Sequence, residues 1–114
     1  MMEISDARIA KRYLTLYNKC QRDNIPFNLT LGQYKQLFRR KLCPYTGIVL
    51  KDSVLHQGDK VPPCHPTVDK IIPERGYIAG NVILASYGGN TMKGNIDLCT
   101  AKNVVKVLEK YHEL

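Results

Sequence analysis

Residues 66–95 read PTVDKIIPERGYIAGNVILASYGGNTMKGN, and this stretch decides the fold. Residues 67–72 are rich in β-branched side chains and stop at Pro73, which predicts a short strand. The glycine-containing segment 74–80 then predicts a turn, and the apolar run within residues 81–86 predicts a second strand.

A short helix is expected directly after the second strand. In this interpretation Gly88 and Gly89 break the chain, and residues 90–94 form the helix. Strand, turn, strand and short helix make a ββα unit, so the fold class that we expect is α+β.

Two helices are expected before this unit. Ser5 is a suitable N-cap for a helix that ends near Arg22. Thr30 and Gln33 have the spacing of a capping box, which predicts the start of a second helix. The cations of residues 39–41 are expected to close this helix, because they favour the negative end of the helix dipole.

The segments on either side of the ββα unit complete the prediction. Residues 51–65 are predicted as a long loop, with a short hairpin over residues 48–55 as an option. Asp97 is expected to cap a last helix, whose apolar face is Ala101, Val104, Val105 and Leu108. The prediction is one domain, 1–114, with a helical part over 1–42, a ββα core with a long loop over 43–95, and a C-terminal helix over 96–114.

The composition favours a polyanionic partner. The chain has 114 residues, with 17 Lys and Arg against 10 Asp and Glu, and a formal net charge of +7. A small domain with this charge attracts nucleic acid most commonly. No apolar run is long enough for a membrane span, and the N-terminus lacks the apolar core of a signal peptide. We therefore expect a cytoplasmic protein without a membrane partner, either a monomer or a homodimer.

Two polar residues of the ββα unit have the chemistry of a metal site. Asp69 lies on the first predicted strand, and Asn90 lies at the start of the short helix. A carboxylate and an amide oxygen are hard ligands, suited to one Mg²⁺ or Mn²⁺ ion. Lys93 lies one helical turn beyond Asn90 and is expected to contact a phosphate. Together they would hold the ion against a phosphodiester and stabilise the charge that develops on the leaving 3′ oxygen.

The motifs of this stretch resemble those of the HNH, or His-Me finger, nucleases. The matching segments are Asp69-Lys70-Ile71-Ile72-Pro73, Gly76-Tyr77, Asn81-Val82 and Asn90-Thr91-Met92-Lys93-Gly94. The segment NLTLGQY followed by CPYTG is similar to the flank of the ββα core in small phage-type members. The resemblance covers about residues 29–111 and implies a ββα-metal core with flanking helices.

The resemblance implies a metal-dependent DNA endonuclease, encoded by a phage or another mobile element, with RNA as an alternative substrate. Asp69 and Asn90 would be its metal ligands, and the Asn81 side chain would brace the loop between the strands. Nucleic-acid contacts are expected from Lys70, Arg75, Lys93, Arg39 and Arg40. For Arg39 and Arg40, the alternative is a simple role at the end of the second helix.

One departure from the family pattern concerns the general base. The family usually has a His directly after the strand Asp, and here that position is Lys70. An ordinary lysine is protonated at neutral pH and cannot take a proton from water, although it can bind phosphate. His65 is the nearby imidazole, and an extended strand would put it on the face of Asp69. It is an alternative base in one interpretation and a loop residue without a role in the other.

A second departure concerns zinc. Many relatives hold the ββα unit with two pairs of cysteines. Here Cys43 remains of the first pair and Thr46 fills the second place, while the region of the other pair holds Ala85, Ser86 and Gly89. The set Cys43, Cys64, His56 and His65 is irregularly spaced for four zinc ligands. A structural Zn²⁺ is therefore not expected.

Two further interpretations stay open. The chain could be a catalytically degenerate HNH-fold module that binds nucleic acid, or inhibits a host protein, without cleavage. Lys70 is the residue that favours this interpretation. The third is a basic DNA-binding domain with no relation to nucleases.

Overall fold

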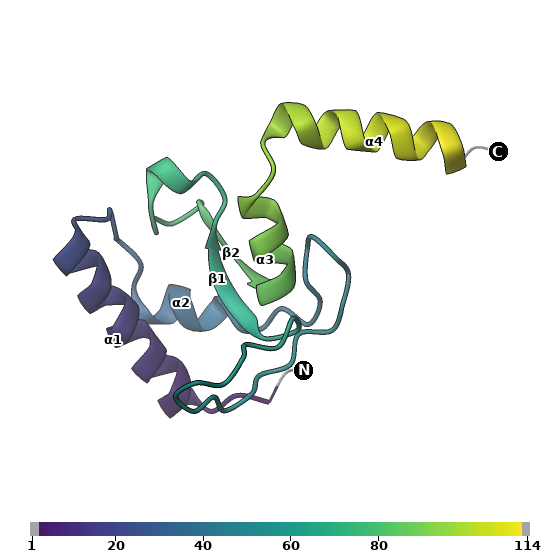
Figure 1. Ribbon diagram of the computed structural model, residues 1–114. Coiled ribbons are helices and arrows are strands. Elements are labelled where there is room, and N and C mark those ends of the chain that lie inside the picture. Colours follow the sequence, from purple (N-terminus) through teal and green to yellow (C-terminus); the bar gives the residue numbers. More distant parts are fainter. Residues whose placement is uncertain (1–2, 113–114) are drawn as a thin grey trace.

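The computed structural model describes residues 3–112 of the chain (Figure 1). The elements in order are α1 (Asp6–Asp23), α2 (Leu31–Leu37), β1 (Pro66–Lys70), a 3₁₀ helix (Pro73–Arg75), β2 (Val82–Ser86), α3 (Tyr87–Gly94) and α4 (Leu98–His112). Within these residues, the combination of α-helices with a two-stranded antiparallel sheet confirms the α+β fold class.

The helices begin where their capping residues predict. The Ser5 side chain accepts a backbone hydrogen bond from the first turn of α1, with a length of 3.2 Å. Thr30 begins α2 with a complete capping box, and Asp97 Oδ1 accepts a 2.7 Å bond from the N–H of Thr100 in α4. Each of these caps satisfies a backbone N–H that has no partner inside its helix.

β1 and β2 confirm the two predicted strands. They pair with a register that runs from Pro66 opposite Ser86 to Lys70 opposite Val82. α3 follows β2 without a loop and contacts both strands. Side chains alternate between the two faces of a strand, so Thr67 and Asp69 lie on one face of β1, and the residues between and beside them lie on the other.

The loop between β1 and β2 is attached to the connection between α1 and α2. The N–H of Tyr77 donates to the carbonyl oxygen of Pro26 at 2.8 Å, and Phe27 and Tyr77 form an isolated parallel bridge. Gly76 has a φ of 76°, and a Cβ there would lie 2.5 Å from the Pro26 carbonyl oxygen. Only glycine therefore fits this approach of two backbones.

One hydrophobic cluster joins the helical part to the sheet. Its buried members are Ile9, Leu29, Tyr34, Phe38, Cys43, Leu50, Leu84 and Ala85. The cluster takes side chains from α1, α2, the loop after α2, and β2. Because these residues share one core, α1 and α2 fix the position of the sheet that carries Asp69.

Two expected features near α2 differ in the structure. The helix ends at Leu37, before the cations of residues 39–41, because the N–H of Phe38 bonds to the carbonyl oxygen of Lys35 and tightens the last turn. The optional hairpin over residues 48–55 is not formed. Within the described chain, this segment has only the single bridge between Leu42 and Val49.

The prediction that Gly88 and Gly89 break the chain is wrong, because both lie inside α3. Ser86 caps this helix, and its Oγ accepts a 3.0 Å bond from the N–H of Gly89. A Cβ at Gly89 would lie 2.9 Å from the Sγ of Cys43. The glycine thus lets α3 approach Cys43 closely, and this packing outweighs its cost of about 1 kcal/mol in a helix.

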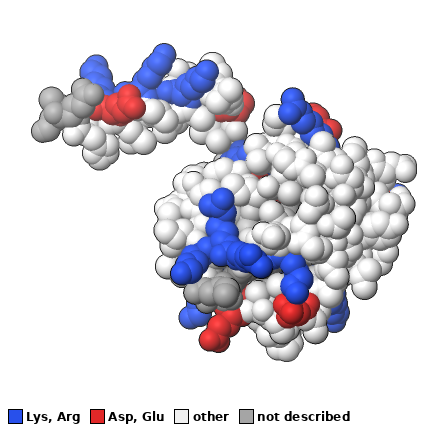
Figure 2. Space-filling model, turned by 180° about the vertical axis from the view of Figure 1, so that it is seen from behind, with Lys and Arg blue, Asp and Glu red and all other residues white. Residues whose placement is uncertain are grey.

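α4 projects from the rest of the molecule (Figure 1). Its expected apolar face does not pack on the body, and Val104, Val105 and Leu108 are 44%, 49% and 50% exposed. The arm that α4 forms in Figure 2 carries a row of basic side chains. Among the described residues, no helix combines the length and the apolar character needed to cross a membrane.

Candidate functional site

Asp69 is held between β1, α3 and the turn that contains Tyr45. The residue is buried, with 6% of its surface exposed. Its Oδ2 accepts a 2.5 Å hydrogen bond from the Tyr45 hydroxyl and lies 2.9 Å from the Nζ of Lys93. Burial, followed by the bond to Asp69, raises the pKa of Tyr45, so this hydroxyl stays a donor. Within residues 3–112, both polar partners of the Asp69 carboxylate bind Oδ2, and no side chain or backbone group donates to Oδ1.

Lys93 ties α3 to the end of β1. Its Nζ donates a 2.7 Å hydrogen bond to the carbonyl oxygen of Lys70 and also forms the ion pair with Asp69. The ammonium group lies 5.9 Å from the centre of the Tyr45 ring. Lys93 therefore lies directly beside the carboxylate, and its expected contact with a phosphate stays a prediction.

The orientation of the Asn90 amide follows from its hydrogen bonds. The Thr67 hydroxyl donates to the carbonyl oxygen of Ala85 at 3.3 Å, so its oxygen can only accept from Asn90. Asn90 Nδ2 donates this 3.2 Å bond. Among residues 3–112, no donor bonds to the Oδ1 of Asn90.

Asp69 of β1 and Asn90 of α3 lie where the helix runs along one face of the strand. Asn90 contacts Thr67, and Lys93 contacts Asp69, so one turn of α3 runs alongside two residues of β1. Two residues of a strand span about 6.6 Å. No hydrogen bond joins Asp69 to Asn90 among residues 3–112, and each presents one carbonyl-type oxygen without a protein donor.

Lys70 and His65 lie away from this pair. The Nζ of Lys70 is 5.1 Å from the centre of the Tyr77 ring, on the face of β1 opposite to Asp69. His65 is buried beside Asp52, with 4.0 Å between its Nδ1 and Asp52 Oδ1. Burial, and then the charge of Arg12, lower the pKa of His65. Both residues considered as general bases are therefore engaged with other groups in this conformation.

Asn81 connects the two ends of the loop between the strands. Its Nδ2 donates to the carbonyl oxygens of Ile72 (3.0 Å) and Gly76 (2.7 Å), and its Oδ1 accepts from the N–H of Ile72 at 3.0 Å. The residue is 5% exposed. These bonds fix the end of β1, and with it the position of Asp69 relative to α3.

Four positions meet at the start of α3. The Sγ of Cys43 accepts hydrogen bonds from the N–H and the Oγ of Ser86, at 3.3 and 3.2 Å. A Cβ at Gly89 would lie 2.9 Å from Cys43 Sγ and 3.3 Å from Thr46 Cγ2. Burial raises the pKa of Cys43, but hydrogen bonds from Ser86 and Thr46 outweigh it and lower the pKa to about 6. A thiol and two hydroxyl-bearing side chains thus form a small polar cluster here.

The other predicted nucleic-acid contacts are exposed but dispersed. Arg39 and Arg40 follow α2, and Arg75 ends the 3₁₀ helix between the strands. In the view of Figure 2, basic side chains gather on one part of the body as well as along α4. No described contact joins Arg39, Arg40 or Arg75 to Asp69 or Asn90.

Sequence reasoning missed two residues that shape the site. Thr67 orients Asn90, and strand alternation would have found it, because it lies two residues before Asp69. Tyr45 holds Asp69 from a turn 24 residues away, and no local pattern signals such a contact. Within residues 3–112, no group of three or more His, Cys, Asp and Glu side chains is placed to hold a metal ion, and Asn90 belongs to none of these residue types.

Comparisons with known proteins give no match to a family model, to a curated protein or to a solved structure.

Proposed function

We propose that this chain is an HNH-type, metal-dependent endonuclease that hydrolyses phosphodiester bonds of DNA. In this proposal β1, β2 and α3 form a ββα-metal core, and Asp69 and Asn90 hold one Mg²⁺ or Mn²⁺ ion. The motif order in residues 69–94 is the sequence basis for the proposal.

The observation that carries the proposal is a pair of oxygens left for a ligand. Among residues 3–112, the hydrogen-bond and ion-pair partners of Asp69 bind Oδ2 and the partner of Asn90 binds Nδ2, so the Oδ1 atom of each is without a donor. A carboxylate and an amide oxygen suit a hard cation that keeps several waters. The donor set therefore fits the proposed ion.

The polar cluster at the start of α3 supports the proposal from a second side. Cys43 and Thr46 are separated by two residues, and so are Ser86 and Gly89, which is the spacing of two C-x-x-C pairs. The four positions converge around Cys43 Sγ. In the family that the sequence resembles, many members place a zinc knuckle in this region. In this chain, hydrogen bonds and close packing around Cys43 would hold the start of α3 in place of a zinc ion.

The chain's own residues would have distinct roles in cleavage. A bound divalent ion would supply Lewis-acid stabilisation of the charge on the leaving 3′ oxygen. Tyr45 and Lys93 hold the Asp69 carboxylate from Oδ2 and fix its orientation. Lys93 is also the cation nearest to this carboxylate, and would contact a phosphate oxygen. Asn81 would keep the strand ends in register.

A second function, nucleic-acid binding without cleavage, is favoured by a specific observation. Lys70 is in the position of the family's general base and is turned to the Tyr77 ring, while Lys93 already neutralises Asp69. A site in this state would hold a phosphate backbone without activating water. The same assay separates the two functions.

The test is nicking of supercoiled plasmid with Mg²⁺ or Mn²⁺, with binding to the same plasmid measured in EDTA. We expect metal-dependent nicking by the native chain and its loss in Asn90→Ala. This variant removes one ligand from a half-buried helix position and leaves the Asp69 ion pair intact. Asn103→Ala, at an exposed position of α4, is the matched control and should nick normally.

Binding without nicking in either metal would refute the nuclease and favour the binding module. Equal nicking by the native chain and Asn90→Ala would also contradict the proposed site, because the activity would then come from elsewhere or from a contaminant. Circular dichroism of each variant establishes that the fold is retained.

A further inference from the structure

A groove lined by basic side chains lies between α1 and β1. The groove has a volume of about 370 Å³ and is lined by Arg8, Lys11, Arg12, Thr15, Lys19 and Val68, among others. The α1 residues follow the spacing i, i+3, i+4, i+7 and i+11, so they form one stripe along the helix. At 1.5 Å per residue the stripe is about 16 Å long.

The positive charge of this groove is only partly neutralised. Asp52 pairs with Arg8, with 2.7 Å between its Oδ2 and Arg8 Nε, and no carboxylate lies among the lining residues. Lys11 and Lys19 are exposed and form no ion pair with any described residue. An anion entering the groove would therefore meet two lysines without a carboxylate partner, Lys11 and Lys19, and two arginines that share the single carboxylate of Asp52.

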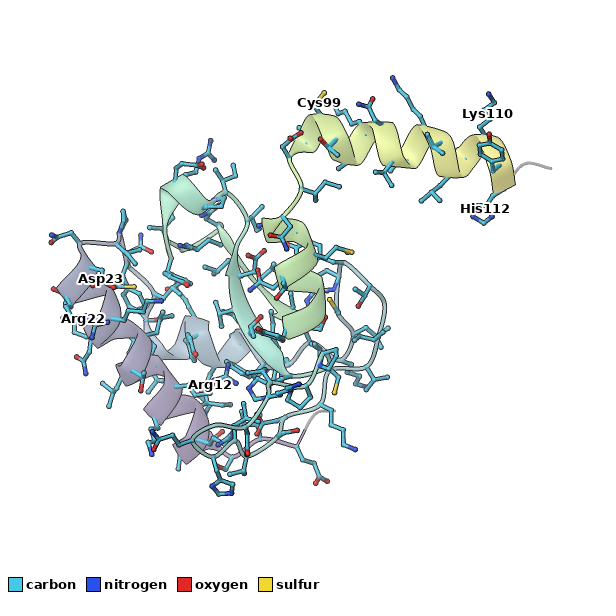
Figure 3. All side chains as sticks on the ribbon, viewed as in Figure 1. Arg12, Arg22, Asp23, Cys99, Lys110 and His112 are labelled. Atoms are coloured by element: carbon cyan, nitrogen blue, oxygen red, sulfur yellow. The ribbon has the colours of Figure 1, made fainter. Side chains whose placement is uncertain are left out.

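Arg12 points from α1 toward the start of β1 (Figure 3). Its Nη2 donates a 2.8 Å hydrogen bond to the carbonyl oxygen of Pro66. Its Nη1 is buried, lies 3.9 Å from Asp52 Oδ1 and has no hydrogen-bond partner among the described residues. Arg12 therefore fixes the wall of the groove at the start of β1 and contributes positive charge to it, while the exposed Lys11 and Lys19 are the cations that an anion can contact directly.

The strand edge adds a backbone donor to the same groove. Ile71 and Asn81 form a hydrogen-bonded pair, because the N–H of Ile71 donates to Asn81 at 2.8 Å. Antiparallel pairs alternate, so Val68 opposite Leu84 is a non-hydrogen-bonded pair. The N–H and C=O of Val68 thus point to the open edge of the two-stranded sheet, which the groove follows.

We propose that this groove binds the sugar–phosphate backbone of a nucleic-acid duplex. A single phosphate ion would need one convergent cluster of donors, whereas here the cations extend along three turns of α1. The aromatic ring in the lining, Tyr34, is 2% exposed and offers no face for stacking a base. The chemistry is therefore that of contacts to successive phosphates, without reading of bases.

The groove is distinct from the proposed metal site. Asp69 pairs with Lys93 of α3, whereas Arg12, Lys11 and Lys19 belong to α1. Thr67 lines the groove as well, but its hydroxyl is bonded to Ala85 and Asn90. Binding in the groove needs no divalent ion and does not depend on whether the chain cleaves DNA.

The test compares two charge reversals with the same change in net charge. Lys11→Glu with Lys19→Glu alters the groove, and Lys102→Glu with Lys110→Glu alters exposed lysines with the same i, i+8 spacing on α4. Affinity for a duplex of DNA, and for an RNA duplex of the same sequence, is measured by fluorescence anisotropy in EDTA over a range of salt. The slope of log K against log salt is negative, and each lost phosphate contact reduces its magnitude by about 0.9.

We expect the groove variant to lower the magnitude of this slope by about 2 on at least one duplex, and the α4 variant to lower it by clearly less. The duplex on which the groove variant loses more of the slope's magnitude, DNA or RNA, is the one whose backbone the groove binds better. Equal slopes for the two variants on both duplexes would overturn the groove, because net charge alone would then explain binding. Should the reversal variant not fold, Lys11→Gln with Lys19→Gln and the same change at the two α4 positions replace both pairs.

Discussion

The two sides of β1 differ in how the charges of their side chains are paired. On the α3 side, Asp69 is matched by Lys93 and Tyr45 at 2.9 and 2.5 Å. On the α1 side, Asp52 forms an ion pair with Arg8 and lies 3.9 Å from Arg12. Two buried nitrogens beside it, Arg12 Nη1 and His65 Nδ1, have no hydrogen-bond partner among the described residues. The first arrangement is balanced around one carboxylate, and the second has an excess of cations.

This difference indicates what each side can bind. A balanced carboxylate with a free oxygen suits a cation, and unbalanced guanidinium and ammonium groups suit an anion. A phosphodiester with a divalent ion contains both charges. One small sheet would therefore place a metal ligand set and a backbone-binding groove on its two sides.

The largest expected effect concerns the start of α3, where Ser86 and Thr46 form hydrogen bonds with Cys43. We expect the combined change Thr46→Cys, Ser86→Cys and Gly89→Cys to create a tetrahedral Zn²⁺ site. Zinc binding of this kind contributes on the order of 10 kcal/mol in small domains. The measurements are zinc content and a thermal unfolding temperature that falls on addition of EDTA.

The control for this variant is Thr46→Ser with Gly89→Ser, which adds similar bulk without thiols. It should bind no zinc and should be less stable than the native chain, because a Cβ at Gly89 approaches Cys43 Sγ to 2.9 Å. A triple-cysteine variant that is folded but binds no zinc would show that the four positions do not converge as described.

On the α1 side, Asp52→Asn removes the carboxylate that serves the cationic cluster. The side chain of Asp52 is 7% exposed, and Arg8 and Arg12 would lose their nearest negative charge. We expect a loss of about 2 kcal/mol in the free energy of unfolding, measured with urea. Glu109→Gln on exposed α4 removes the same charge and should change stability by less than about 0.5 kcal/mol. Equal losses in the two variants would mean that Asp52 is not a structural partner.

On the α3 side, Lys93→Met removes the ammonium and keeps most of the apolar stem. Removing Lys93 leaves a carboxylate whose side chain is 7% exposed, with Tyr45 still donating to it, so we expect a loss of about 2 kcal/mol in stability. Affinity for Mn²⁺ should rise, because Asp69 then has no competing cation. Titration followed by electron paramagnetic resonance measures this affinity. Unchanged or weaker Mn²⁺ binding would contradict the assignment of Asp69 as a ligand.

The smallest effect is a pH dependence on the α1 side. His65 has a lowered pKa in the folded chain and an ordinary value near 6.5 when unfolded, so the unfolded chain binds the proton more readily. Stability should therefore fall as the pH falls through 6.5 toward the folded value. His65→Asn should flatten the difference in urea midpoint between about pH 7.5 and 5. His56→Asn, at an exposed loop position, should not change it.

The sequence was sufficient for the elements with local signals. The caps at Ser5, Thr30 and Asp97 depend on residues three positions apart, and the two strands depend on apolar runs bounded by proline and glycine. All of these were predicted correctly. Such signals act between residues that are close in sequence, so they can be recognised without knowing the tertiary contacts.

The errors lie where distant contacts decide the structure. Gly89 lies inside α3 and not at a break, because it lets the helix approach Cys43, 46 residues earlier in the chain, where a Cβ would lie 2.9 Å from the Sγ. The pairing of Asp69 with Lys93 and Tyr45, and of His65 with Asp52, also joins separate segments. The residue types of the candidate site could be read from the chain. The partners that orient them could not, because they depend on tertiary packing.

The most direct test of the central claim is a crystal structure of the native chain soaked with Mn²⁺, with anomalous difference maps. The account predicts one strong peak within about 2.3 Å of the Oδ1 atoms of both Asp69 and Asn90. No peak at a saturating Mn²⁺ concentration, or a peak bound only to other residues, would contradict it.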